Sequence, residues 1–379
     1  MKKNTQVISI IIFISTLVLL ISFGGQKAEW KGTIEEKDGI KVIKNPIEPL
    51  FGELKFELEE DLSIGTEDDD NYMFYMVRGI ATDSQQNIYV LDWGNFRIQK
   101  FDKNGNYLQT IGRHGQGPGE FEHTMELRID ELTGNIYVKD GRFEIEKFDM
   151  KGNHTEAIKL EKPIWNFFPT RNENFIILQF TTSDEEISKA ICKLNPKGFF
   201  LESYAKVPYQ MHYKREGEMV TMGWLAYAYD LVLTKFEDFR YVYGYSKEYE
   251  LNIIGDEGNL LLKIIKDESY QGFSVREKRK YGKLRDLPSH KPFFYSIITD
   301  SRGRIYVQRN RTRGQEFRVN REVDIFSKDG YYLYKSSIPR GTYIIKDGYV
   351  YAYVMNEDKG EELVKRYRIK NWKDIKERI

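Results

Sequence analysis

The chain has 379 residues, and its 58 Lys and Arg residues are balanced by 58 Asp and Glu residues, so its formal net charge at pH 7 is +0. This balance gives no reason to expect nucleic acid as a partner. The single cysteine, Cys192, excludes a disulfide within the chain, and its place in an apolar alternating stretch predicts a buried thiol.

The N-terminus carries the pattern of an export signal or a single membrane anchor. Two lysines precede an apolar run at residues 7–23, and polar sequence follows. Ser22 and Gly24 are small residues at the spacing that signal peptidase prefers, which favours cleavage over anchoring. We therefore expect residues 1–28 to be a signal peptide or membrane anchor, and the protein to be exported to the periplasm or the extracellular space. Any membrane contact is expected through this segment alone.

After an N-terminal extension at residues 29–53, a strand is expected at residues 54–64, which read LKFELEEDLSI. Residues 79–121 then contain four short strands, separated by turn-forming residues. The second strand, at residues 88–91, is β-branched and aromatic, as a half-buried strand is. Residues 102–105 form a turn in which Gly105 is free to take a positive φ. This stretch therefore predicts one antiparallel four-stranded sheet.

The same stretch resembles the NHL repeat, in which an Ile-Tyr-Val strand lies between an Asp-rich turn and an Arg-Ile strand. The matching residues are Asp83, Asn87, Ile88, Tyr89, Val90, Asp92, Arg97, Ile98, Phe101, Asp102 and Gly105. Proteins built from this repeat are β-propellers, commonly with six blades. The Gly-rich joint at residues 112–119 is similar to that of exported bacterial six-bladed β-propeller proteins of unassigned function.

Similar units recur along the whole chain, and the repeat predicts an all-β, six-bladed propeller in one domain at residues 54–379. The units begin near Val77, Met125, Ile164, Tyr229, Phe294 and Thr342. The sixth unit has its third strand at residues 362–369 and no fourth strand after it. Residues 54–64 can supply the missing strand and close the ring, which removes exposed sheet edges.

Propeller topology sorts the loops by face, and every long insertion is expected on one of them. The insertions lie at residues 205–228, 265–292 and 309–321. Long loops on a rigid scaffold are where binding surfaces are usually built. The candidate ligand-binding residues expected on this face are Trp93, Asn95, Arg113, His114, Arg142, Arg309, Arg311 and Arg313.

A cationic helix is expected at residues 274–287 on the same face. Ser274 and Glu277 form a capping-box pattern, and Pro288 ends the segment. Such a charged helix is most often a solvated face; as a functional feature it would join the arginines in binding an anion. The acidic stretch at residues 57–70 could instead neutralise these cations within the protein or across a dimer.

Catalytic motifs are weak. The Gly-rich segment at residues 112–119 lacks a GK[ST] ending and precedes a strand, so we interpret it as a joint between blades. Asp92 and Arg97 are expected to tie two strands together. Nothing resembles Gly-x-Ser-x-Gly, so the sequence assigns no catalytic residue.

Metal-dependent enzymes are the alternative class, because some NHL-type propellers are zinc-dependent lyases and some six-bladed propellers are calcium-dependent lactonases. Zinc would need several converging imidazoles, but His114, His123, His154, His212 and His290 are scattered, and His154 is expected on the opposite face. For calcium, the candidates are Asn95, Asp140 and Asn166. We assign no metal ligand and no cofactor.

The sequence therefore favours a monomeric, exported binding or scaffolding propeller that recognises a peptide, glycan, protein or anionic ligand through its loop-rich face. A zinc- or calcium-dependent lyase or lactonase acting at the central channel is the alternative.

Overall fold

The computed structural model describes residues 29–66, 68–182, 187–209, 211–216, 219–224, 227–237, 239–281, 287–309 and 320–377. The chain divides into Met1–Lys31 and Gly32–Ile379, and the fold below is that of the second unit. The first unit contains the expected export segment, of which residues 1–28 lie outside the described residues.

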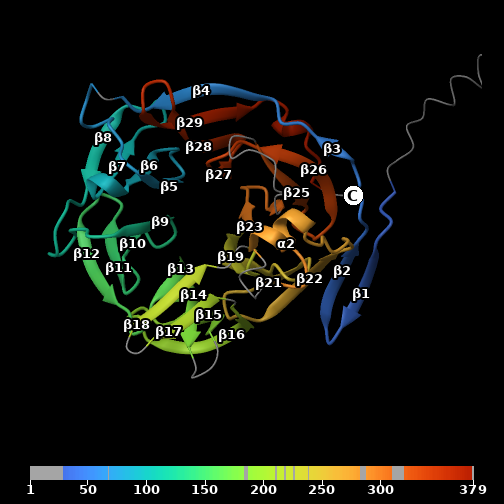
Figure 1. Cartoon of the computed structure of the whole chain (residues 1–379). Coiled ribbons are helices and arrows are strands. Elements are labelled where there is room, and N and C mark those ends of the chain that lie inside the picture. Colours follow the sequence, from blue (N-terminus) through green and yellow to red (C-terminus); the bar gives the residue numbers. More distant parts are fainter. Residues whose placement is uncertain are drawn as a thin grey trace, which may run out of the picture. The chain divides into compact units, whose positions relative to one another are not determined.

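Six antiparallel sheets surround a common centre, as the repeat predicted (Figure 1). Blade 1 contains β5 (Val77–Thr82), β6 (Ile88–Asp92), β7 (Arg97–Phe101) and β8 (Tyr107–Ile111). Blade 2 contains β9 (Thr124–Asp130), β10 (Asn135–Asp140), β11 (Glu144–Asp149) and β12 (His154–Lys159). Blade 3 contains β13 (Ile164–Pro169), β14 (Phe175–Thr182), β15 (Ile187–Leu194) and β16 (Phe200–Pro208).

The other three blades include strands from the N-terminal part of the chain. Blade 4 contains β19 (Leu231–Phe236), β20 (Arg240–Tyr245), β21 (Glu250–Ile254) and β22 (Leu260–Lys266). Blade 5 contains β23 (Phe294–Thr299), β24 (Ile305–Arg309), β25 (Arg321–Phe326) and β26 (Tyr332–Ile338). Blade 6 contains β27 (Thr342–Lys346), β28 (Tyr349–Asn356), β29 (Glu361–Ile369) and β4 (Leu58–Ile64).

The ring closes where β4 pairs antiparallel with β29, which confirms the closing strand predicted from the sequence. The strand is shorter than expected, because Glu53–Leu54 form β3, which pairs parallel with β26 in blade 5. The acidic residues of β4 face basic partners on β29: Glu60 pairs with Lys365 at 2.9 Å and Asp61 with Arg366 at 3.0 Å. These carboxylates therefore neutralise the closing seam.

Residues 29–53 contribute further strands to the propeller. The hairpin of β1 (Thr33–Lys37) and β2 (Ile40–Asn45) adds to blade 4, because β2 pairs parallel with β22. Asn45 fixes the end of this hairpin, since its side chain donates to the Gly330 carbonyl at 2.8 Å and accepts from the Tyr332 amide at 2.7 Å. Residues 33–64 thus run along the outer edges of blades 4, 5 and 6 (Figure 1).

The turns between third and fourth strands have a common cause. In blade 1 the Asp102 carboxylate accepts the amides of Asn104 at 2.8 Å and Asn106 at 2.9 Å, and Gly105 takes a φ of +84°. Asp149 and Asn195 hold the corresponding turns of blades 2 and 3 in the same way. Local side-chain chemistry therefore sets the short turns of the scaffold.

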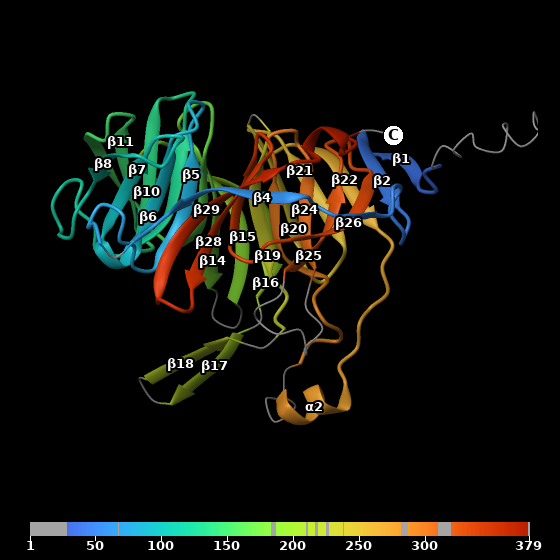
Figure 2. The ribbon, with the colours of Figure 1, turned by 90° about the horizontal axis from the view of Figure 1, so that it is seen from above.

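Two of the three long insertions project from one face, as expected (Figure 2). The hairpin of β17 (Met211–Glu216) and β18 (Met219–Trp224) follows blade 3, and helix α2 (Val275–Tyr281) follows blade 4. Two 3-10 turns complete the described elements, η1 (Trp93–Asn95) and η2 (Trp372–Asp374). We call the side with the β17–β18 hairpin and α2 the loop-rich face. Of the third insertion, expected at residues 309–321, residues 310–319 lie outside the described residues.

The seam between blades 6 and 1 generates a stability prediction. Glu362, which is 9% exposed, accepts the amides of Met76 and Val77 at 2.8 Å each. We expect Glu362→Ala to lower the free energy of unfolding by about 2–3 kcal/mol, because it leaves one buried amide (Val77) and one partly buried amide (Met76) without an acceptor. Urea unfolding of the full chain measures this change. The control is Glu59→Ala, an exposed carboxylate on β4 of the same blade, whose loss should lower the free energy of unfolding by less than about 0.5 kcal/mol. Equal losses in both variants would contradict the prediction.

Candidate functional site: the channel mouth

The first strands of the six blades surround the centre of the ring (Figure 1), and five of them carry a β-bulge at the same position. In blade 1, Val77 pairs with Asp92 and Gly79 with Leu91, so that Arg78 is left out of the register. The residues bulged in this way are Arg78, Met125, Trp165, Tyr295 and Tyr343. Bulges re-aim a side chain and are frequent beside functional sites. Each lies where the first strand leaves the loop-rich face.

Four of the five bulged residues line one cavity of about 410 Å³. They are Arg78, Met125, Trp165 and Tyr343. The cavity lining is strongly cationic, because it also contains Arg128, Lys139 and Arg142 against one carboxylate, Glu126, among the described lining residues. We call this cavity the channel-mouth site.

Two exposed arginines of the site are held by aromatic rings. The Arg78 guanidinium lies 4.6 Å from the ring centre of Trp93, and that of Arg142 lies 5.8 Å from the ring centre of Trp165. No carboxylate among the described residues pairs with either of them. Stacking on an aromatic face fixes a guanidinium and leaves its N–H groups available.

The two inner cations of the site are more enclosed. Arg128 stacks 4.5 Å from the ring centre of Phe168, donates to Asn166 Oδ1 at 3.0 Å and pairs with Glu126 Oε1. Lys139 is 3% exposed and donates to the Trp165 carbonyl. Burial lowers the pKa of the Lys139 ammonium, because it removes water from the charge, and Glu126 only partly offsets this effect.

Trp165 is supported from behind by a second buried lysine. Lys189, whose side chain is 1% exposed, lies about 5 Å from three ring centres, those of Trp165 (5.1 Å), Phe180 (5.1 Å) and Tyr209 (4.6 Å). Its Nζ is 2.5 Å from Asp230 Oδ1. These contacts hold the indole that faces the site.

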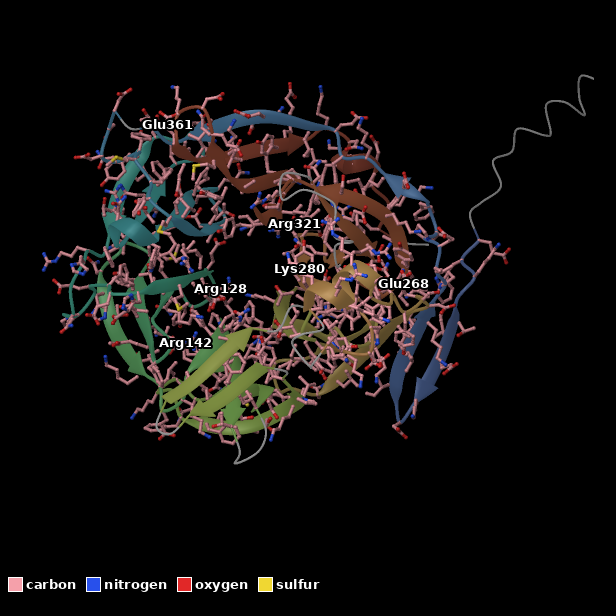
Figure 3. The ribbon with its side chains drawn as sticks, in the orientation of Figure 1. Arg128, Arg142, Glu268, Lys280, Arg321 and Glu361 are labelled. Atoms are coloured by element: carbon pink, nitrogen blue, oxygen red, sulfur yellow. The ribbon has the colours of Figure 1, made fainter. Side chains whose placement is uncertain are left out.

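Tyr343 extends the site toward blade 5. Burial raises the pKa of Tyr343, and the nearby cations Arg78 and Arg321 oppose that rise. Arg321 lies 5.7 Å from the ring centre of the fifth bulged residue, Tyr295, and donates to Gln308 Oε1 at 3.0 Å. Figure 3 shows Arg128 and Arg321 on different sides of the ring centre.

The structure brings three of the residues named from the sequence to this site. Arg142 and the calcium candidate Asn166 line the cavity, and the Trp93 ring in η1 stacks against Arg78. The reasoning from sequence missed Arg78, Arg128, Lys139, Trp165 and Tyr343. For the bulged residues the signal was their common position, directly after the first residue of the inner strand.

The other described candidates have partners outside the cavity. Asn95 donates to Asp92 Oδ2 at 2.9 Å, Arg113 pairs with Glu120 at 2.7 Å, and the His114 ring lies 4.4 Å from that of Phe96. Arg311 and Arg313 lie outside the described residues.

Arg309 belongs to a buried charge cluster between blades 4 and 5. Its Nη2 is 3.0 Å from Glu268 Oε2, and its Nε is 3.8 Å from Asp324 Oδ2. Asp324 accepts the hydroxyls of Tyr249 at 2.5 Å and Tyr332 at 2.6 Å, and burial raises the pKa of both phenols. The charge of Arg309 is therefore balanced within the protein.

Several expectations about single residues are confirmed. Asp92 pairs with Arg97 Nε at 2.9 Å across β6 and β7. The Cys192 thiol is buried and accepts from Gln179 at 3.1 Å. The Gly-rich segment at residues 112–119 joins blades 1 and 2, with a bridge between His114 and Phe121.

The metal candidates do not converge in the described part of the chain, where no group of three or more His, Cys, Asp or Glu residues could hold a metal ion. Asp140 accepts the amides of Glu122 at 2.9 Å and His123 at 2.5 Å. His154 contacts Glu146 at 2.6 Å, and His290 contacts the Tyr229 hydroxyl at 3.1 Å. The side chain of His212 lies outside the described residues.

The predicted capping box is present in α2. The Ser274 amide donates to Glu277 Oε2 at 2.9 Å, and the Glu277 amide donates to Ser274 Oγ at 3.3 Å. Residues 282–286, where the helix was expected to continue, lie outside the described residues. The cationic side chains Arg276, Lys278 and Arg279 are exposed, as on a solvated face.

Comparison with known families supports the fold. A model of the DUF5128 family, described as a six-bladed β-propeller, matches residues 64–220. The match agrees with the number of blades, whereas the assignment of the repeat to the NHL type stays a prediction. No curated protein matches the chain at a significant level.

Solved structures with the same fold share little sequence with this chain. An exported-protein candidate from Bacteroides fragilis is 13% identical, with a TM-score of 0.57 over 86% of this chain and 100% of its own. A DUF4221 family member from Bacteroides vulgatus is 13% identical, with a TM-score of 0.47 over 83% and 98%. A gluconolactonase from Xanthomonas campestris is 11% identical, with a TM-score of 0.44 over 83% and 99%. At these identities the likeness concerns the fold alone.

Among the described residues, no helix has both the length and the apolar character of a membrane span.

Glu277 generates a pH prediction for the loop-rich face. Burial alone would raise its pKa, but hydrogen bonds from Ser274, Lys291 and Tyr227 outweigh burial and lower the pKa from 4.5 to about 2. The carboxylate therefore stabilises the fold fully above about pH 4.5, and this contribution is lost as the pH falls from 4.5 toward 2. We expect Glu277→Gln to lower the free energy of unfolding by about 2 kcal/mol at pH 7, because the Lys291 ammonium loses its buried carboxylate partner.

Urea unfolding of both proteins between pH 7 and pH 3 measures this effect, and the difference between them should shrink toward the acid end. Glu156→Gln, at an exposed position on β12, serves as the control. A difference that is constant over this pH range would contradict the assignment.

Proposed function

We propose that this propeller is an exported binding protein that captures an anionic ligand at the channel-mouth site. The main support comes from Arg78 and Arg142. Their exposed guanidinium groups line one cavity and stack against aromatic rings. An arginine presents a planar fork of donors that matches carboxylate, sulfate or phosphate. Peptides and glycans that carry such groups are both suitable ligands.

Electrostatics support the same proposal. Four cationic side chains line the cavity against a single carboxylate among the described lining residues. A concave site with one dominant sign of charge focuses the field and raises the local concentration of counter-ions. The site also opens on the loop-rich face, where the insertions can add contacts to a larger ligand.

Binding measurements test the proposal with three probes: trigalacturonate, a sulfated oligosaccharide and a tetra-aspartate peptide. We expect the full chain to bind at least one of them, and the affinity to fall as salt is added. Arg78→Ser combined with Arg142→Ser should weaken that binding by at least about tenfold, because each lost charge-assisted hydrogen bond is worth about 1.5–3 kcal/mol.

The matched control is Arg113→Ser. Arg113 is 80% exposed, follows blade 1 and pairs with Glu120 outside the cavity, so its removal should leave probe affinity unchanged. Equal affinity of the double variant and the parent protein would refute the placement of the site.

Export is a separate part of the proposal and has its own test. If the apolar run at residues 7–23 is a cleaved signal, the mature protein should begin close to Gly25, after the small residues Ser22 and Gly24. Intact mass of the protein purified from its native host measures this directly. A mass that includes residues 1–24 would favour a retained anchor.

A further inference from the structure

One carboxylate oxygen inside the channel-mouth site lacks a hydrogen-bond partner. The Glu126 side chain is 12% exposed, and its Oε1 pairs with Arg128. Its Oε2 is buried and accepts no hydrogen bond from any described residue. The nearest cation, Lys139 Nζ, is 3.5 Å away, which is longer than the 2.7–2.9 Å of a charge-assisted hydrogen bond.

The position of Glu126 explains why the protein itself leaves this oxygen open. Glu126 follows the bulged Met125 and lies directly across from Lys139 in the register of β9 and β10. The Lys139 ammonium donates to the Trp165 carbonyl, and its 3.5 Å distance to Glu126 Oε2 leaves that oxygen without a short hydrogen bond. A buried acceptor that receives no hydrogen bond is unfavourable, so a ligand that brings a donor to Glu126 Oε2 gains affinity on binding.

The other walls of the cavity restrict the ligand further. The arginines Arg78 and Arg142 call for an anionic group, and the aromatic side chains Trp165 and Tyr343 add apolar surface to the cavity lining. The volume of about 410 Å³ lies within the usual range of small-molecule sites. One ligand must therefore combine an anion, a hydrogen-bond donor and a ring or chain of moderate size.

We infer that the ligand of the channel-mouth site is a polyhydroxylated carboxylate of the sugar-acid class, free or at the end of a glycan. Its carboxylate binds Arg78 and Arg142, one of its hydroxyls donates to Glu126 Oε2, and its carbon skeleton packs on Trp165 or Tyr343. This inference rests on the proposed function, because it assumes that the site binds anions.

The test compares ligands that differ in their hydroxyl groups and share one carboxylate. The probes are D-glucuronate, D-galacturonate and D-gluconate, with cyclohexanecarboxylate as the analogue without hydroxyls, titrated by calorimetry into the full chain at pH 7. We expect at least one sugar acid to bind about tenfold or more tightly than cyclohexanecarboxylate, because only the sugar acids supply the donor that Glu126 lacks.

The outcomes distinguish a failure of the sugar-acid inference from a failure of the proposed anion site. Equal binding of the sugar acids and cyclohexanecarboxylate overturns the inference and leaves the proposed anion site standing. Failure of all four probes to bind, when trigalacturonate and the other anionic probes also fail, overturns both.

Substitution of Glu126 tests the acceptor itself. Glu126→Met removes both oxygens at similar length and should abolish the preference for sugar acids, while binding of cyclohexanecarboxylate is kept or strengthened because a negative charge is lost. Glu126→Gln is the milder variant, should the first not fold, and is expected to reduce the preference. Glu156→Gln, on the outer strand of the same blade, should keep the full preference, and a full preference in Glu126→Met would overturn the inference.

Discussion

The face-to-face packing of neighbouring blades is the interaction on which the rest of the structure depends. Strand β6 shows this directly, because every one of its residues is buried. Ile88 and Val90 pack in a cluster with blade 6, whereas Tyr89 and Leu91 pack in a cluster with blade 2. Successive side chains of a strand point to opposite faces of the sheet, so each blade needs a neighbour on both sides. Only a closed ring meets that need for all six blades, which is why β4 has to return to β29.

The closed ring makes the inner strands rigid and leaves the loops free to vary. The repeated bulge then changes one residue per blade without disturbing the packing, since Arg78 leaves the register while Val77 and Ile80 on either side stay buried. The channel-mouth site is thus built from scaffold positions, whereas the β17–β18 hairpin and α2 are additions on the same face. Rigid positions suit the precise recognition of a small group, and the longer loops suit contacts with whatever that group is attached to.

The number of blades, their boundaries and the face of the insertions were predictable because they depend on local chemistry, such as the Asp102 turn. Features that depend on distant pairing were not. Residues 33–45 read as an extension because the partner of β2 is β22, more than 200 residues away in the sequence. The site was only partly predictable for the same reason. Arg309 was predicted as a ligand-binding residue because it lies in a loop, but its charge is balanced by Glu268 and Asp324. Arg78 stands inside a strand, at a bulge whose recurrence is visible only when the blades are compared.

The partner of a cationic side chain is therefore a better guide to a candidate anion site here than the face on which the side chain lies. Arg113 and Arg309 are held by carboxylates and offer little net charge, while Arg78 and Arg142 are held by Trp93 and Trp165 and keep theirs. Glu126 adds a negative charge to this group of cations. A cavity of cations alone would accept any small anion, but a buried carboxylate among them penalises an anion that brings no donor. In the proposed function, this combination selects a ligand that carries both an anionic group for the arginines and a hydrogen-bond donor for Glu126.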